Sequence, residues 1–196
     1  ALNQNTTASN NTAIGTAALQ NLLNGGSNTA IGYNSAAAMT SGTENVAVGK
    51  NALEDVTTGG QNVAVGATAL ANNTATGNTA VGHGSFAANT SGNQNVGVGY
   101  ATGFGNTTGL YNTAVGYQAL VSNVDGDSNT AIGRRALYTF EASSDGDGEN
   151  TAVGALSAYA LTTGTGNTAV GKQSYANATT GVDNTAVGHD ALKSNT

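Results

Sequence analysis

The chain of 196 residues contains no cysteine, no proline and no tryptophan, and only 8% of its residues are charged. Without cysteine, neither disulfides nor thiolate metal sites can form. Five basic residues against eleven acidic ones give a net charge of −6. Nucleic acid and anionic membrane surfaces require basic patches that neutralise phosphate groups, so the sequence predicts neither as a partner. No apolar run has the length of a membrane span, and we expect any targeting signal to lie outside this segment.

Large apolar side chains are also scarce. Leucine, isoleucine, valine and phenylalanine account for 33 of the 196 residues. Such a low content permits disorder, but the low charge and the regular spacing of the apolar residues argue against it. We therefore expect a thin fold, or one that shares a core with other copies of itself.

What the chain does have is a repeat. A pentad Asn-Thr/Val-Ala/Gly-Ile/Val-Gly recurs every 17 residues, with one step of 16 and one of 21. It begins at Asn11, Asn28, Asn45, Asn62, Asn78, Asn95, Asn112, Asn129, Asn150, Asn167 and Asn184. A fixed period of this size predicts a solenoid. We number each repeat from its pentad Asn, which is position 1.

Positions 2 and 4 carry branched side chains that favour strands, and alternate residues of a strand share a face. We therefore predict one short strand per repeat, with positions 2 and 4 facing inward and the small residue at position 3 facing outward. Position 4 is the predicted core ladder: Ile14, Ile31, Val48, Val65, Val81, Val98, Val115, Ile132, Val153, Val170 and Val187.

The remaining positions complete a coil. Position 5 is always Gly, which predicts a positive φ or a close approach by another chain. Position 8 is small, position 9 is usually a bulky apolar plug, and a Thr/Ser/Gly turn closes the repeat. Helical repeats are the alternative, but glycines leave fewer than ten residues for each helix. The prediction is an all-β parallel β-solenoid of about eleven coils in a single domain, 1-196, with a partial repeat 1-10, ten repeats 11-183 and a partial repeat 184-196.

The segment Ser27-Asn28-Thr29-Ala30-Ile31-Gly32 resembles the head repeat of YadA-like trimeric autotransporter adhesins, and the repeats are also similar to those of phage tail-fibre proteins. The resemblance implies a left-handed β-roll in which three chains share a core, in an adhesive structure at the cell surface or on a virion. This sequence differs in its longer repeat, with an added Ala-Leu segment and a Thr-Thr-Gly turn.

Elementary energetics also favour a shared core. Each coil offers about three branched or bulky side chains, worth ~1.5–3 kcal/mol apiece when buried. Ordering the backbone costs ~1–2 kcal/mol per residue. Partner chains would supply part of the difference, so we expect a homotrimer about 50–55 Å long, at ~4.8 Å per coil.

Catalysis has little support in the sequence, and we predict no enzyme. His83 and His189 occupy position 6 but lie six coils apart, so exposed variable positions are expected there. The glycines follow the repeat and do not form a nucleotide loop. No cofactor is predicted.

Acidic residues gather in two neighbouring turns: Asp125, Asp127, Asp145, Asp147 and Glu149. In register, these carboxylates could hold Ca²⁺; a solvated acidic bulge with Asp-Gly turns is the alternative. Position 1 predicts an amide ladder between coils. Tyrosines at positions 6 and 9, among them Tyr33, Tyr100, Tyr117 and Tyr175, suit either sugar stacking or packing at a chain interface.

The function expected from these features is a structural or adhesive module of a trimeric fibre, extracellular or virion-attached. Its partners would be copies of itself and a surface receptor that the sequence does not identify. Two alternatives stay open. One is an extracellular filament subunit that stacks head to tail. The other is an ice-binding solenoid, which is disfavoured by the inward direction predicted for position 2.

Overall fold

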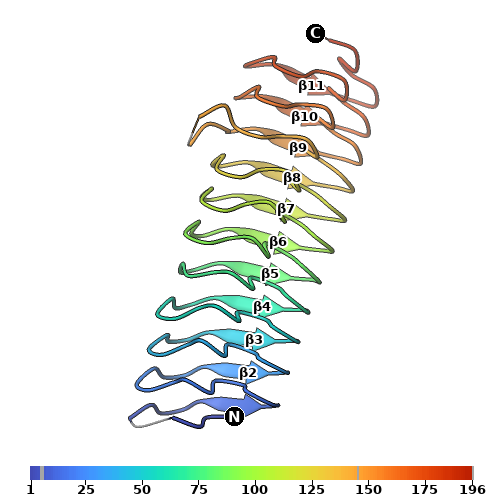
Figure 1. Ribbon diagram of the computed structural model, residues 1–196. Coiled ribbons are helices and arrows are strands. Elements are labelled where there is room, and N and C mark those ends of the chain that lie inside the picture. Colours follow the sequence, from blue (N-terminus) through green and yellow to red (C-terminus); the bar gives the residue numbers. More distant parts are fainter. Residues whose placement is uncertain (5–6, 145, 196) are drawn as a thin grey trace.

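The computed structural model describes residues 1–4, 7–144 and 146–195. This part of the chain forms a stack of flat coils whose strands make one eleven-stranded parallel sheet in the order β1 to β11, with no helix among the described residues (Figure 1). The predicted all-β solenoid is confirmed. The strands are β1 (Thr12–Ile14), β2 (Thr29–Ile31), β3 (Val46–Val48), β4 (Val63–Val65), β5 (Thr79–Val81), β6 (Val96–Val98), β7 (Thr113–Val115), β8 (Thr130–Ile132), β9 (Thr151–Val153), β10 (Thr168–Val170) and β11 (Thr185–Val187).

Equivalent repeat positions stack on one another. Val115 pairs with Ile132, and Ile132 pairs with Val153 across the longest step of the repeat. The register is also kept across the 16-residue repeat, where Val63 pairs with Thr79. The missing residue and the four extra residues both fall in the turn between position 12 and the next pentad, where a change of length does not disturb the sheet.

The predicted direction of the strand side chains is wrong. Position 3 faces inward: Ala30, Ala64 and Ala114 are fully buried. Positions 2 and 4 face outward, so the predicted core ladder lines up in one column, but that column is on the surface. Within it, Val98 is 41% exposed and Ile132 is 38% exposed. Alternation along a strand predicts two faces, and the thin interior of the coil decides which one is buried.

That interior is filled from the opposite side of the coil. Position 9 supplies the buried plugs Leu19, Leu53, Leu70, Phe86, Leu120, Leu137 and Tyr175. They share the interior with small buried residues at position 8 and with a second apolar residue at position 12, such as Leu22, Met39 and Phe140, which the repeat pattern alone does not reveal. Because these plugs occupy the space beneath the sheet, only Ala or Gly fits at position 3.

A large core residue in one coil is matched by small residues in the next coil. Phe86 follows β5, and the next coil has glycine at both facing positions, Gly97 and Gly103. A Cβ on Gly97 would lie 2.6 Å from the Phe86 ring, and a Cβ on Gly103 would lie even closer to it. The two glycines therefore provide the room in which the larger ring is buried.

Glycine at position 5 is required for two reasons: the backbone has a positive φ there, and the backbone of another coil approaches closely. Gly116 has φ +123°, a conformation that L side chains rarely adopt. A Cβ there would lie 2.8 Å from the carbonyl of Gly133, the equivalent residue of the next coil. The close approach is thus made by the next coil of the same chain.

The predicted asparagine ladder at position 1 is confirmed. The side-chain oxygen of Asn112 accepts a hydrogen bond from the backbone N–H of Asn129 at 2.9 Å, and the Asn112 amide donates to the carbonyl of Gly126 at 2.8 Å. The same arrangement recurs along the described stack, for example between Asn28 and Asn45. Each coil is thereby tied to its neighbours through buried amides.

A second buried amide ladder occupies position 12 in the middle of the molecule. Asn89 donates to Asn73 at 2.7 Å, Asn106 to Asn89 at 2.7 Å, and Asn123 to Asn106 at 2.8 Å. The ladder ends where Phe140 takes the position, and Asn123 Oδ1 is left buried without a hydrogen-bond partner.

Candidate functional site

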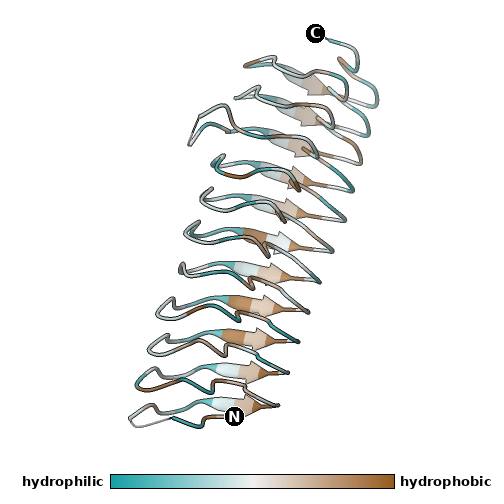
Figure 2. Cartoon of the chain, in the orientation of Figure 1, coloured by the Kyte–Doolittle hydropathy of each residue, from teal (hydrophilic) through white to brown (hydrophobic). Residues whose placement is uncertain are grey.

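The largest regular surface is the outer face of the sheet. We call the outward side chains at positions 2 and 4 of β1 to β11 the sheet face. It holds a column of Thr or Val beside a column of Ile or Val, with no charged residue at either position. Apolar colour marks the strand ends along the stack in Figure 2. The result is a long, uncharged strip in which every side chain is β-branched.

One long edge of the coil carries nearly all of the positive charge. This basic edge consists of positions 6 and 7, directly after the strands. It includes Lys50, Arg134, Arg135 and Lys172, together with His83 and His189. The fifth basic residue, Lys193, lies at position 10 and pairs with Asp190 at 3.0 Å. That contact lowers the pKa of the exposed Asp190 carboxyl, with the Lys193 hydrogen bond as the main cause.

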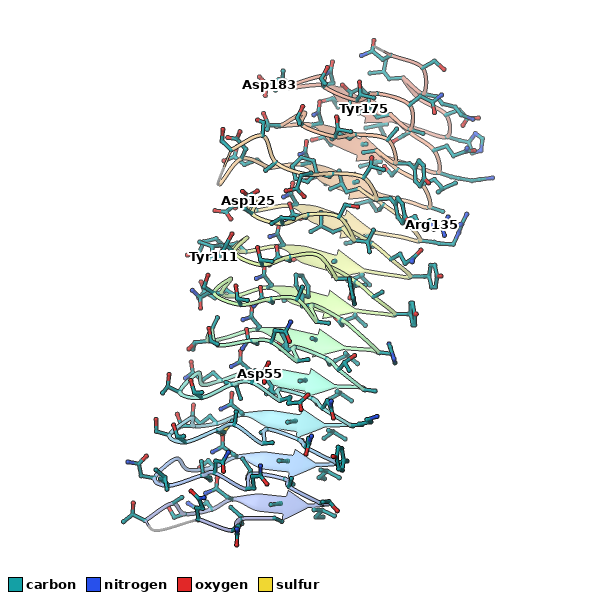
Figure 3. All side chains as sticks on the ribbon, viewed as in Figure 1. Asp55, Tyr111, Asp125, Arg135, Tyr175 and Asp183 are labelled. Atoms are coloured by element: carbon teal, nitrogen blue, oxygen red, sulfur yellow. The ribbon has the colours of Figure 1, made fainter. Side chains whose placement is uncertain are left out.

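The opposite long edge carries most of the negative charge. This acidic edge runs from position 13 to the end of each repeat and includes Glu44, Asp125, Asp127, Glu141, Asp147, Glu149 and Asp183. Figure 3 shows Asp125 and Asp183 on one side of the stack and Arg135 on the other. The sequence analysis did not predict this segregation, although sorting charged residues by repeat position would reveal it.

Aromatic rings form stacks on the basic edge. His83 stacks on Tyr100, and Tyr100 on Tyr117, with ring centroids 5.4 Å apart in both pairs. The Arg135 guanidinium lies 5.9 Å from the centroid of Tyr117. Because these rings cover one another's faces along the stack, they present mainly their edges outward. Tyr175 at position 9 is 1% exposed and acts as a core plug.

Of the acidic residues singled out as calcium candidates, the four that the structure describes do not gather into a ligand cluster. The Asp127 carboxylate accepts a hydrogen bond from the Leu110 N–H at 2.7 Å, and Asp147 accepts one from the Ser143 hydroxyl at 3.0 Å. Among the described residues, no group of three or more His, Cys, Asp or Glu is arranged to hold a metal ion. Asp145 lies outside the described residues, while Asp125 and Glu149 belong to the acidic edge.

Glu141 lies in the acidic edge beside Asp125. Burial raises the pKa of the Glu141 carboxyl above its ordinary value of 4.5, the negative charge of Asp125 raises it further, and a backbone hydrogen bond at Val124 opposes the change. Other repeats place Thr at this position, as in Thr107 and Thr162, where the hydroxyl donates to the next coil. Glu141 is thus an unfavourable charge in a turn otherwise built from hydroxyl groups.

The two histidines lie six coils apart, and the His189 Nδ1 lies 3.2 Å from the carboxylate of its neighbour Asp190. The described part of the chain also holds no helix of the length and hydropathy needed to cross a membrane. Comparisons with protein-family models, with curated proteins and with solved structures found no match. The function is therefore inferred from the sheet face and the two charged edges.

Proposed function

We propose that the chain is a rod-like structural segment of a multi-chain fibre outside the cell or on a virion, in which three copies associate side by side through the sheet face. The observation that carries the proposal is the sheet face itself. It is eleven strands long, uncharged and lined with branched side chains, several of them more than a third exposed in the single chain. Contiguous apolar surface of this kind is typical of an interaction site.

The segregated charges support the same arrangement. In a closed ring of copies, each subunit presents one surface to the neighbour ahead and a different one to the neighbour behind. The basic edge and the acidic edge border the sheet face on its two sides, so the basic edge of one copy can approach the acidic edge of the next. Complementary charge of this kind sets the orientation of association more than its strength.

The regular coil suits a spacer. Each coil adds ~4.8 Å of length, so the eleven strands extend over about 50 Å. Backbone hydrogen bonds and the position 1 ladder connect successive coils along the described stack. Such a stack holds whatever lies at one end at a fixed distance from the other.

Thiol labelling tests the proposal, because a single introduced cysteine is unique in a chain that has none. Val98→Cys places a thiol on the sheet face, and Thr108→Cys places a matched thiol on the exposed turn of the same coil. We expect a maleimide to label the turn at least tenfold faster. Equal labelling of both positions at every protein concentration would contradict association through the sheet face.

Ice binding is a second candidate, because the structure turns position 2 outward. The strands β7 to β11 all present Thr beside Val or Ile, from Thr113 and Val115 to Thr185 and Val187. These residues stack in register along the sheet face. The structure offers one threonine column and not two, so the fibre proposal takes precedence.

Thermal hysteresis decides between the two. An ice-binding protein separates the freezing and melting temperatures of its solution, and Thr130→Lys would abolish that difference by placing a charge in the threonine column. The fibre proposal predicts no hysteresis in the wild type.

A further inference from the structure

A depression of about 240 Å³ lies on the acidic edge between the turns that precede β4 and β7. Its main lining residues are Gln61, Gly77, Gln94 and Tyr111, which all occupy the last position before a pentad Asn. Tyr111 projects from this edge in Figure 3. None of the described acidic residues lines the depression.

The depression has a structural cause. Gln61, Gln94 and Tyr111 occupy the same position of their coils and share a left-handed backbone conformation, with φ between +57° and +59°. Gly77 has the related φ of +75° but no side chain, and it lies in the one repeat that is a residue short. A gap is therefore left between Gln61 and Gln94. A Cβ on Gly77 would still lie 3.5 Å from its nearest neighbour, the Cγ of Gln94, so the gap can accept a side chain.

The groups around the gap are neutral and retain free hydrogen-bonding capacity. The Gln61 amide donates to Glu44 at 3.1 Å, which leaves its carbonyl oxygen available. The Asn93 side-chain oxygen accepts from the Thr76 N–H at 3.0 Å, which leaves its amide available. Tyr111 is 57% exposed and adds an apolar ring with a hydroxyl at its tip.

This combination selects for a ligand that carries hydroxyl groups. A hydroxyl both donates and accepts, and primary amides offer both functions side by side. An aromatic wall packs against the C–H side of a flat, polar ring. Anionic ligands are disfavoured because no cation lines the depression and Glu44 lies next to Gln61. The volume is below the roughly 300–1,000 Å³ of sites for drug-sized ligands, which suits one sugar ring.

We propose that this depression, the Gly77 pocket, binds one residue of a neutral saccharide. The proposal is independent of the fibre proposal, since all of the lining residues come from one chain. A spacer with such a pocket along its side would contact glycans between its ends.

Saturation-transfer NMR with glucose, galactose, mannose and N-acetylglucosamine, alone and as short oligosaccharides, tests the pocket. We expect transfer from the Tyr111 ring to at least one of these sugars at millimolar concentration, and none to N-acetylneuraminic acid. Gly77→Asn fills the pocket, and Asn tolerates the left-handed conformation. It should weaken binding at least tenfold, as should Tyr111→Ala.

Gly166→Asn is the matched control. Gly166 occupies the same repeat position with φ +68°, far along the stack, so this variant imposes a similar left-handed backbone and leaves the pocket open. Its Cβ would meet the carboxylate of Asp183, an exposed side chain that can turn away. It should bind as the wild type does. The proposal is overturned if no sugar of the panel binds, if Gly77→Asn binds as well as Gly166→Asn, or if N-acetylneuraminic acid binds as well as the neutral sugars. Thiol labelling of Val98→Cys reports on chain association separately, so either proposal can fail alone.

Discussion

At the scale of single residues, buried amides connect the coils in addition to the apolar plugs. Asn112 is fully buried and acts in three hydrogen bonds at once: it accepts from the backbone N–H and the side-chain amide of Asn129, and it donates to Gly126. Asparagine suits this role because its side chain carries a donor and an acceptor side by side.

Replacing Asn112 with Ala should therefore destabilise the protein strongly. The change removes the acceptor shared by the buried Asn129 backbone N–H and side-chain amide, while the Gly126 carbonyl keeps a hydrogen bond from the Asn123 amide at 2.9 Å. Each buried group left without a partner costs about 1–3 kcal/mol. We expect a loss of ~2–4 kcal/mol in the free energy of unfolding, measured by urea denaturation. Asn184→Ala is the control: the Asn184 side chain donates to its neighbours, but no described residue donates to its oxygen, so the cost should be about 1 kcal/mol. Equal losses in both variants would show that the ladder does not connect the coils.

At the scale of one coil, the size of the plug at position 9 is matched to the size of the residue at position 3 of the next strand. Gly97 in β6 replaces the Ala found at this position in the ten other strands, because the Phe86 ring and the Ser85 hydroxyl occupy the space that a methyl group would need. The neighbouring coil shows the usual pair, with Leu70 as the plug and Ala80 in the strand.

A double-mutant cycle tests this matching. Gly97→Ala should destabilise through the clash with Phe86, and Phe86→Leu should destabilise by leaving a cavity. The double variant should lose less free energy of unfolding than the sum of the two single losses, by ~0.5–3 kcal/mol, since contacting residues are coupled by such amounts. Additive losses in thermal or urea unfolding would contradict the matched packing of Phe86 and Gly97.

The turn that contains Glu141 predicts a pH dependence. Burial, followed by the charge of Asp125, raises the pKa of Glu141 in the folded protein above its ordinary value of 4.5. The folded state therefore disfavours the ionised form, so stability falls as the pH rises from about 4.5 through the raised pKa, and no such loss occurs below 4.5. Glu141→Gln should raise the melting temperature at pH 7 and leave it unchanged at pH 3.5. A variant with the same melting temperature as the wild type at pH 7 would refute this assignment.

The repeat predicts the position of each strand, the register and the amide ladder at position 1, because all three follow from period and local preference. It does not predict which face of the strand is buried. Ala30 and Val48 both belong to alternating sets, and choosing the larger side chain for the core is the natural rule. That rule fails here because plugs such as Leu53 enter from the far side of the coil. The repeat also does not predict the second ladder, because Asn73 and Asn106 resemble the other polar residues of the closing turn.

At the scale of the whole molecule, the inward alanines leave the chain with a thin core and an uncharged outer strip of branched side chains. Charge is separated onto the two edges that border this strip. A single copy gains little from burying alanine, while side-by-side copies would bury the Ile and Val column as well. We therefore propose that the sheet face is an interface between copies.

Light scattering coupled to size-exclusion chromatography tests that claim most directly. The wild type should have about three times the 19.1 kDa mass of one chain. Val115→Lys places a charge in the middle of the sheet face, at an outward position that does not affect the core, and should reduce the mass toward that of one chain. Thr108→Lys, on the exposed turn, should leave the mass unchanged. A wild-type protein that remains a stable 19.1 kDa particle at every concentration would contradict the account.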